Sequence, residues 1–506
     1  MRYQNPILSG FYPDPSICRV GNDYYMVTST FEFFPGVPVF HSTDLVNWTQ
    51  IGHCLTRRSQ LDLVRVPASK GIYAPTIRYH DGVFYMVTTN TRKCGNFYVY
   101  TTDPAGEWSE PILVDQDGID PSLFFDDDGK CYFISNAGAK EHGMLLSEID
   151  LKTGKLSRTA PVWKGTGGKA PEAPHIYKVN GWYYQMIAEG GTELGHMETI
   201  ARSRELFGPY EPCPYNPILT HFREKGNMIQ ATGHADLVQA PDGSWWAVFL
   251  GYRQTHQYFH HLGRETFLAP VEWTEDGWPL INGKRAIQLT MDAPLPGNPV
   301  QQPRKPISTR FDEGKPGLDW VYLRNPHMEN YRFDRGCLEL RGTALTLSEE
   351  DAPTFLGVRQ VFMDGDAKVT LSYAPEKDGE EAGVSVFYKF DAHYDIALTQ
   401  RGGKRCVIVR KVIGDVTHIA AELPVDTDTV TLHIVSDSLH YAFSAIVDGE
   451  EKPLCGALTR YVSTEAHELG FTGVFLALYA SGNGQDCSGF ARFTEFHFCD
   501  RENATV

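Results

Sequence analysis

Long hydrophobic runs are missing from this 506-residue sequence, and no apolar stretch approaches the roughly 20 residues that cross a bilayer. Its opening, MRYQNPILSGFYPDPS, also lacks the apolar core of a secretory signal. We therefore expect a cytoplasmic protein without a membrane partner. With 42% hydrophobic and 12% aromatic residues, the chain is long enough for two or three globular domains.

Positive charge is in the minority, and the formal net charge is -17 at pH 7. An acidic surface repels phosphate backbones and anionic lipid, so nucleic-acid partners are disfavoured and a neutral carbohydrate is compatible. The ten cysteines are spread singly from Cys18 to Cys499, without a C-x-x-C pair. This pattern favours reduced thiols over a disulfide framework or structural zinc.

Helical periodicity is almost absent, and a repeat is present instead. Five segments share the order small or polar residue, apolar strand, Gly-centred turn, aromatic-rich strand, and a third strand follows each of them. Successive turn glycines are 61, 47, 52 and 62 residues apart, at Gly21, Gly82, Gly129, Gly181 and Gly243. That spacing is the size of a four-stranded blade, so residues 1–292 are predicted to form a five-bladed β-propeller.

A Pro- and Gly-rich stretch, APLPGNPVQQPRKP, occupies residues 293–306 and is the clearest linker in the chain. Residues 307–506 alternate polar and apolar side chains in short stretches such as AKVTLSYA and TVTLHIVSD. The stretch lengths and turn spacing predict an antiparallel β-sandwich. The fold class is therefore all-β, a propeller followed by a sandwich.

Acidic residues recur at a nearly fixed place in the repeat. The position before the Pro of the repeat holds Asp14, Ala74, Asp120, Ala173 and, where Ala replaces the Pro, His234; Glu172 lies one residue earlier than Ala173. These positions begin the strands that line a propeller channel, so Asp14, Asp120 and Glu172 are predicted to face one another. Taken singly, an Asp before Pro more often caps a turn. Taken together, the acids suit glycoside hydrolysis, which needs two carboxyl groups of opposite protonation state, with a third raising the pKa of the acid.

Several ordered motifs resemble glycoside hydrolase family 43, the β-xylosidases and α-L-arabinofuranosidases, over nearly the whole chain. They are NPILSGFYPDPS, FEFFPGVPVFHSTDLVNW, GIYAPTIRYHDGVFYMV, GIDPSLFFDDDG, EAPHIYK, GHADLV and HLGRETF. From Phe311 onward, FDEGKPGLDWVYLRNP and FTGVFLALY resemble the concanavalin-like β-sandwich of the family's two-domain β-xylosidases.

The resemblance implies roles for the three acids. Asp14 matches the general base, Glu172 the general acid, and Asp120 the carboxylate that orients the acid and tunes its pKa. The family often has Gly where this chain has Ala173. The implied activity is an inverting exo-glycosidase that removes terminal non-reducing β-D-xylose, α-L-arabinofuranose or both from xylo- and arabinoxylo-oligosaccharides, with no cofactor required.

Other positions match substrate-binding residues of the family. Arg264 matches an arginine that reaches sugar hydroxyls, the alternative being an ion pair with Glu265. Phe31 matches an aromatic wall of the pocket, the alternative being ordinary core. Tyr73 stands where many of the family's xylosidases carry Trp, so the shape of the first subsite is expected to differ.

Two further positions carry open alternatives. His234 matches a histidine that faces the channel; a structural or substrate-adjacent role is expected, and a nearby calcium ion is the alternative, although calcium prefers oxygen ligands. Phe475 resembles a phenylalanine that the sandwich pushes toward the active site, with a core position as the alternative. The sandwich itself would either close the pocket or bind polysaccharide.

Rival functions remain at this stage. A non-catalytic carbohydrate-binding propeller would use the same acids to hold sugar hydroxyls, and a retaining glycosidase would use one of them as a nucleophile. The sequence leaves open the preference between the two sugars, the binding of calcium, and the oligomeric state, a homo-oligomer included.

Overall fold

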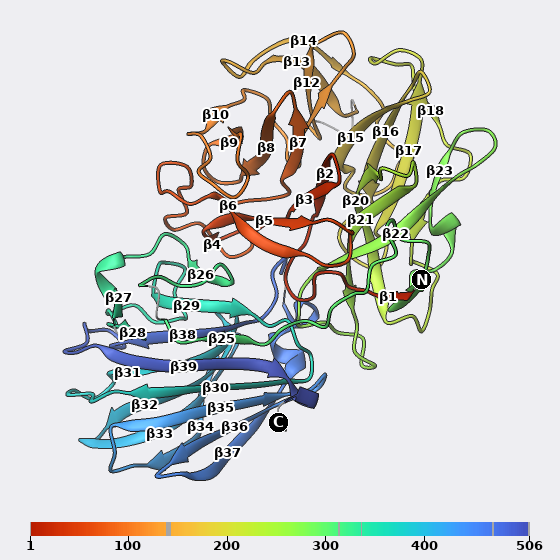
Figure 1. The fold of residues 1–506 in the computed structure, drawn as a ribbon. Coiled ribbons are helices and arrows are strands. Elements are labelled where there is room, and N and C mark those ends of the chain that lie inside the picture. Colours follow the sequence, from red (N-terminus) through yellow and green to blue (C-terminus); the bar gives the residue numbers. More distant parts are fainter. Residues whose placement is uncertain (1, 138–142, 312–313, 335, 468–469, 504–506) are drawn as a thin grey trace.

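The computed structural model describes residues 2–137, 143–311, 314–334, 336–467 and 470–503. It is nearly all-β, and the predicted propeller and sandwich are confirmed (Figure 1). In the described residues, no helix has the length and hydropathy needed to cross a membrane.

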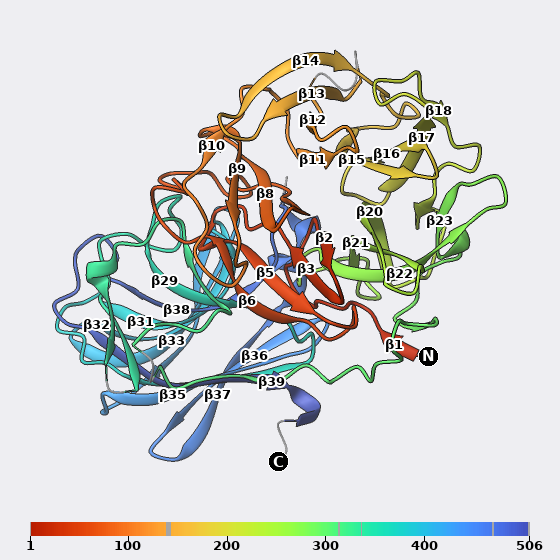
Figure 2. The same ribbon diagram turned by 45° about the horizontal axis from the view of Figure 1, so that its top comes forward.

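Five antiparallel sheets arranged around a common centre form the propeller (Figure 2). Each uses the repeat in the predicted order, with the apolar strand innermost, because aromatic and β-branched residues in alternation pair well on a half-buried surface. The sheets are β2 (Ser16–Val20), β3 (Asp23–Val27), β5 (Gly36–Ser42) and β6 (Thr49–Leu55); β7 (Thr76–His80), β8 (Val83–Asn90), β9 (Gly95–Thr101) and β10 (Ile112–Leu113); β11 (Ser122–Phe125), β12 (Cys131–Ser135), β13 (Leu145–Asp150) and β14 (Lys155–Pro161); β15 (Glu172–Val179), β16 (Trp182–Glu189), β17 (Met197–Ser203) and β18 (Glu211–Pro212), with β19 (Leu219–Thr220) on β17; and β20 (Ile229–Gln239), β21 (Trp245–Arg253), β22 (Glu265–Trp273) and β23 (Pro279–Ile281).

The N-terminal segment closes the ring onto the fifth sheet. Strand β1 (Arg2–Gln4) pairs with β24 (Thr290–Asp292), and Leu8 bridges Thr266 of β22. The Asn5 side chain donates to the carbonyl of Leu268 at 3.0 Å. Closure therefore joins the first segment of the chain to the last blade, and it brings Asp14 beside residues that follow it by about 250 positions.

Two larger sheets stack to form the sandwich, below the propeller in Figure 1. A Pro-rich stretch without regular structure, residues 293–306, precedes them, and single turns of 3-10 helix occur at Asn282–Lys284, Met328–Asn330, Thr459–Val462, Thr464–Ala466 and Arg501–Asn503. One sheet contains, in order, β27 (Tyr331–Asp334), β28 (Cys337–Leu340), β39 (Ala491–Asp500), β30 (Gly365–Ser372), β35 (Thr429–Ser436), β36 (His440–Val447) and β37 (Glu450–Leu458), with β25 (Ile307–Thr309) on β39. The other contains β34 (Val416–Pro424), β33 (Lys404–Ile413), β32 (Ala392–Arg401), β31 (Glu381–Lys389), β38 (Phe475–Ser481), β29 (Thr354–Arg359), β26 (Trp320–Leu323) and β4 (Phe33–Phe34).

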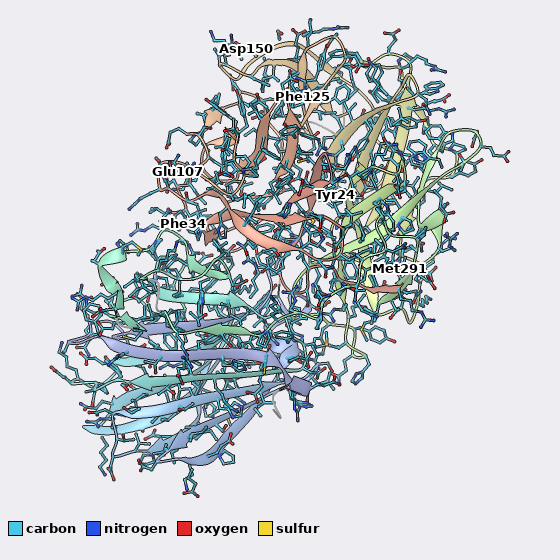
Figure 3. All side chains as sticks on the ribbon, in the orientation of Figure 1. Tyr24, Phe34, Glu107, Phe125, Asp150 and Met291 are labelled. Carbon is cyan, nitrogen blue, oxygen red and sulfur yellow. The ribbon has the colours of Figure 1, made fainter. Side chains whose placement is uncertain are left out.

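A propeller segment completes the edge of that second sheet. Strand β4 pairs with β26, with Leu323 opposite Phe33. Phe34, labelled in Figure 3, lies at this border between the propeller and the sandwich. The ring of Phe33 stacks on Phe475 at 4.1 Å between centroids, and Phe11 packs against both. The two parts therefore share a buried aromatic core, which fixes the sandwich against the rim of the channel.

Candidate active site

Four of the five equivalent repeat positions at the inner strands have an unusual backbone conformation. Asp14, Asp120, Ala173 and His234 have φ of 55, 52, 52 and 52°, in the left-handed region. Residues with a side chain rarely adopt this conformation, and such strain clusters at functional sites. At Ala173 the methyl group makes this backbone conformation unfavourable. Gly has no such group, which gives a physical reason for the Gly that the family often has there.

A bulge explains why Glu172 lies one residue earlier than the aspartates. On β15, Glu172 pairs with Ala188 but His175 pairs with Met186, so the strand carries one extra residue at Ala173 and Pro174. A bulge re-aims the side chains beside it. As a result, carboxylate oxygens of Glu172 and Asp120 and a ring nitrogen of His234 all lie within 4.8 Å of one another.

Asp14 is buried and bound to a cation. Arg264 Nη1 donates to Asp14 Oδ1 at 2.8 Å, and the Ser29 hydroxyl donates to Oδ2. His234 Nδ1 lies 3.7 Å from Oδ1, and burial lowers the pKa of His234, so the imidazole is neutral at pH 7. Asp14 is thus a carboxylate held in one orientation at the channel wall.

Glu172 and Asp120 have the opposite electrostatic setting. Burial, followed by the charge of Asp14, raises the pKa of Glu172 to about 7, and Arg264 opposes the rise. Burial, followed by the charges of Glu172 and Asp14, raises the pKa of Asp120 well above its ordinary value, although the Ala74 backbone and Arg264 act the other way. The site therefore retains a proton on this pair near neutral pH, while Asp14 has a guanidinium partner.

Asp120→Asn is expected to stabilise the protein at pH 8, by about 0.5–2 kcal/mol, the usual range for a single stabilising substitution. The pKa of Asp120 is raised on folding, so ionising it costs more in the folded state, and stability is lost as pH rises above the unfolded value. The gain should vanish toward pH 4. Urea unfolding of the parent and variant across pH 4–8 measures it.

Asp236 provides the matched control for that experiment. Burial alone would raise the pKa of Asp236. The positive charge of Arg78, His175 and hydrogen bonds from neighbours instead hold this pKa below its usual range. Its ionised form stabilises the fold, so Asp236→Asn should destabilise the protein at pH 8. A loss of stability in Asp120→Asn at pH 8 would contradict the assignment of a raised pKa.

The sequence interpretation missed the polar network beneath the acids. Asp236 of β20 accepts from Arg78 of β7 at 2.8 and 3.2 Å, from Ser16 of β2 at 2.6 Å and from Tyr177 of β15 at 2.6 Å. Arg78 also lies 2.9 Å from His175 Nδ1. Four inner strands are thus tied together at the channel centre. The sequence did contain a sign of this network, because Asp236 lies in the same GHADLV motif as His234.

Arg264 lies where the resemblance implied, and its alternative partner is occupied. Glu265 accepts from Arg253 at 2.8 and 2.9 Å, so Arg264 does not pair with it. Arg264 instead contacts Asp14, the Thr192 hydroxyl at 3.2 Å and the Phe471 carbonyl at 3.3 Å. Its Nε is buried and has no hydrogen-bond partner among the described residues.

Aromatic rings form one wall beside this arginine. Phe31 and Phe471 lie 5.5 and 5.6 Å from the Arg264 guanidinium, and Tyr73 packs on Phe31 at 5.3 Å. Phe31 is 2% exposed and Tyr73 is half-buried. Both expected aromatic residues are therefore brought to the site.

Phe475 takes the core position that was the alternative to a place at the active site. This residue begins β38, is fully buried, and packs on Phe11 and Phe33 in the core between propeller and sandwich. Phe471, four residues earlier in the same FTGVF motif, is the sandwich residue that reaches the site, and its backbone N–H bonds the Ser69 hydroxyl at 3.0 Å. Both phenylalanines have apolar neighbours in the sequence. They differ in that Phe471 precedes β38 and Phe475 begins it.

Two facing carboxyl groups, one proton-retaining and one arginine-bound, at the centre of a five-bladed propeller are the arrangement of a glycoside hydrolase. The family model of glycosyl hydrolases family 43 matches residues 3–279, and that of the β-xylosidase C-terminal concanavalin A-like domain matches residues 308–499. The chain belongs to glycosyl hydrolase family 43.

Several relatives align over nearly the whole chain. The non-reducing end α-L-arabinofuranosidase BoGH43B of Bacteroides ovatus is 45% identical, covering 98% of this chain and 94% of that protein. A xylosidase/arabinosidase of Butyrivibrio fibrisolvens is 39% identical, covering 97% and 98%. Among solved structures, the Bacteroides ovatus xyloglucan-locus GH43B superposes with a TM-score of 0.95 at 43% identity, covering 99% of this chain and all of that one.

Proposed function

We propose that this enzyme is an inverting exo-glycosidase that removes terminal non-reducing α-L-arabinofuranose and β-D-xylose from arabinoxylo- and xylo-oligosaccharides. The supporting observation is the opposite setting of Asp14 and Glu172: the first is bound by Arg264, and the second has a pKa of about 7. The names of the relatives support the two sugars.

We propose a role for each acid. Asp14 accepts a proton from water, and the water oxygen attacks the anomeric carbon as the glycosidic bond breaks. Glu172 donates its proton to the leaving oxygen. Asp120 lies against Glu172, and repulsion between the two carboxylates disfavours ionisation of both at once. Arg264, Phe31 and Tyr73 bind the terminal sugar, and Phe471 closes the pocket from the sandwich side.

Product stereochemistry and competition test the proposal. Proton NMR of the first turnovers on an aryl β-D-xyloside should show α-xylose, and initial retention would rule out the inverting mechanism. If both sugars use one pocket, an aryl β-D-xyloside should inhibit hydrolysis of an aryl α-L-arabinofuranoside competitively, with an inhibition constant equal to its own KM. A carbohydrate-binding propeller would show no turnover of either.

The pH dependence should report the Glu172–Asp120 pair. We expect kcat/KM to fall as pH rises through about 7, because the acid then loses the proton that it must donate. In Glu172→Gln, assayed on an aryl glycoside with an activated leaving group, this alkaline limb should disappear. An unchanged limb in that variant would assign it to another group.

We further propose that catalysis needs no metal ion. Asp120, Glu172 and His234 form the one group in the described part of the chain with metal-ligand spacing, but both acids have a raised pKa and favour a proton. Calcium prefers six to eight oxygen ligands, and this set offers an imidazole in place of one. A chelator should leave kcat/KM unchanged, and activation by added calcium would contradict this.

The cellular location stays a prediction. The cytoplasm is supported by the ten cysteines, all of which are unpaired. Cell fractionation with an antibody to the enzyme tests it. The oligomeric state, a homo-oligomer included, is to be measured by sedimentation.

A further inference from the structure

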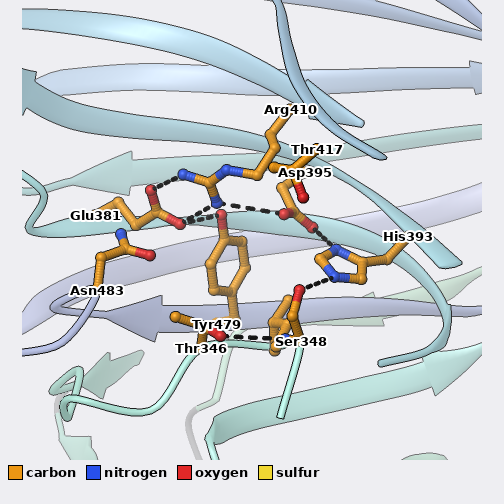
Figure 4. Close-up of a pocket in the computed structure, with 10 residues that line it drawn as sticks. Thr346, Ser348, Glu381, His393, Asp395, Arg410, Thr417, Tyr479 and Asn483 are labelled. Atoms are coloured by element: carbon orange, nitrogen blue, oxygen red, sulfur yellow. Dashed lines mark hydrogen bonds and ion pairs between the residues drawn. The ribbon is translucent and has the colours of Figure 1, made fainter. Parts of the chain in front are cut away.

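A polar cavity of about 140 Å³ opens in the sandwich, away from the acids of the propeller (Figure 4). Its floor comes from the sheet that also contains β4: Glu381 of β31, His393 and Asp395 of β32, Arg410 of β33 and Tyr479 of β38. The segment before β29 covers one side with Thr346, Leu347 and Ser348, while Thr417 and Asn483 complete the rim.

The floor is charged and buried. Glu381, His393, Asp395 and Tyr479 are at most 2% exposed. Arg410 donates to both oxygens of Glu381 at 2.6 Å, and Tyr479 donates to Glu381 at 3.0 Å. His393 Nδ1 lies 2.9 Å from Asp395, and its Nε2 lies 3.1 Å from the Ser348 hydroxyl at the rim. Polar groups thus point into a cavity with fixed geometry.

Packing does not account for this cluster. The same face of the sheet carries an apolar cluster that includes Phe355, Phe387, Ala397 and Ile408, so an apolar filling would continue it. Replacing a buried ion pair by well-packed apolar residues is often neutral or stabilising. The charged floor is therefore a local departure that a packing role does not require.

The chemistry of the cavity selects an uncharged ligand. The guanidinium of Arg410 is already paired with Glu381 and lies 3.4 Å from Asp395, so it offers little to an anion. A cation would meet that guanidinium, and the acids and imidazole here lack the metal-ligand spacing found among the described residues only at Asp120, Glu172 and His234. What remains is a small neutral molecule with many hydroxyl groups.

Size and position agree with one sugar residue. The volume is close to the roughly 150 Å³ of an engineered cavity that holds one benzene ring, so it suits one sugar ring and is too small for an oligosaccharide. Tyr479 and Phe475 lie four residues apart on β38, so they share a face and are separated by about 13 Å. Since Phe475 packs on Phe33 of the propeller, the cavity lies near the contact between the sandwich and the propeller.

We propose that this cavity is a second carbohydrate-binding site, which holds one neutral pentose residue through the carboxylates and the rim hydroxyl and amide groups. It is independent of the propeller acids and needs no turnover. The sugar hydroxyls would form hydrogen bonds with Glu381, Asp395 and Asn483.

A fluorine label at the rim tests the proposal on the full chain. Cys94, the exposed thiol, is replaced by serine, and Thr417→Cys is labelled with a trifluoromethyl reagent. The ¹⁹F signal should shift saturably with L-arabinose or D-xylose, with a Kd of about 1 mM. The same label at Thr429→Cys, an exposed residue of the other sheet, should not shift.

A plug variant decides whether the shift comes from the cavity. Thr346→Trp should fill the mouth and abolish the shift while kcat/KM on aryl glycosides stays unchanged; Asn483→Trp serves if the first variant unfolds at a lower temperature. No saturable shift with either pentose, an equal shift in the plugged protein, or a shift with inorganic phosphate would each overturn the proposal. Because the label reports binding alone, these results are separate from failure of the hydrolytic function.

Discussion

Glu172→Gln is expected to lower kcat by about 10²–10⁴-fold on natural oligosaccharides, the range for losing a general acid. Glutamine keeps the shape of the side chain but has no proton to give to the leaving oxygen. On a dinitrophenyl glycoside, whose leaving group departs as a stable anion, the loss should shrink toward the low end or disappear. The measurement is kcat for a series of aryl glycosides of decreasing phenol pKa.

Glu193→Gln is the matched control, because Glu193 also lies near the pocket but its side chain is 72% exposed and pairs with Lys169 at the surface. It should leave kcat unchanged throughout the series. If the loss in Glu172→Gln were the same for every leaving group, proton donation would not be the function of Glu172. Terminal-sugar binding, measured by calorimetry with D-xylose, should survive in both variants.

The repeat in the sequence was enough to predict the propeller, because blade count depends only on the spacing of turn glycines and on alternation. It also placed Asp14, Asp120 and Glu172 near one another, since equivalent strand positions meet at a channel. The local sequence pattern is enough for both predictions, the blade count and the grouping of the acids, because consecutive strands pair with their neighbours in order.

Other features depend on contacts between distant segments. The pairing of Arg264 with Asp14 spans 250 positions and requires the ring to close. The bulge at Ala173 and the left-handed backbone are set by sheet register, which a single strand does not reveal. Phe471 and Phe475 have similar surroundings in sequence, and only the docking of the sandwich assigns one to the site and the other to the core.

The charged sandwich cavity illustrates the same limit. Glu381, Asp395 and Arg410 occur in strands that read as ordinary alternation, where a polar residue is expected to face solvent. Their burial follows from the segment carrying Ser348, which covers them from outside the sheet. No spacing within one strand indicates that such a cover exists.

Asp14→Asn is expected to lower kcat by about 10²–10⁴-fold for every leaving group, in contrast to Glu172→Gln. The amide cannot accept the proton of the attacking water, and this step is equally needed whether the leaving group is good or poor. Sodium azide should restore part of the turnover, since the azide anion attacks the anomeric carbon without losing a proton. The product should be a glycosyl azide of inverted configuration, identified by proton NMR.

Ser29→Ala distinguishes the role of Asp14 as the base from the role of a residue that holds Asp14 in place. It removes only the hydroxyl that donates to Asp14 Oδ2, and losing one hydrogen bond of about 1 kcal/mol corresponds to a roughly fivefold effect. Arg264 continues to hold Oδ1 in this variant. If the loss in Asp14→Asn instead shrank with better leaving groups, the acid and base assignments would be exchanged. A glycosyl azide of retained configuration would point to a covalent intermediate, because only two successive displacements at the anomeric carbon preserve its configuration.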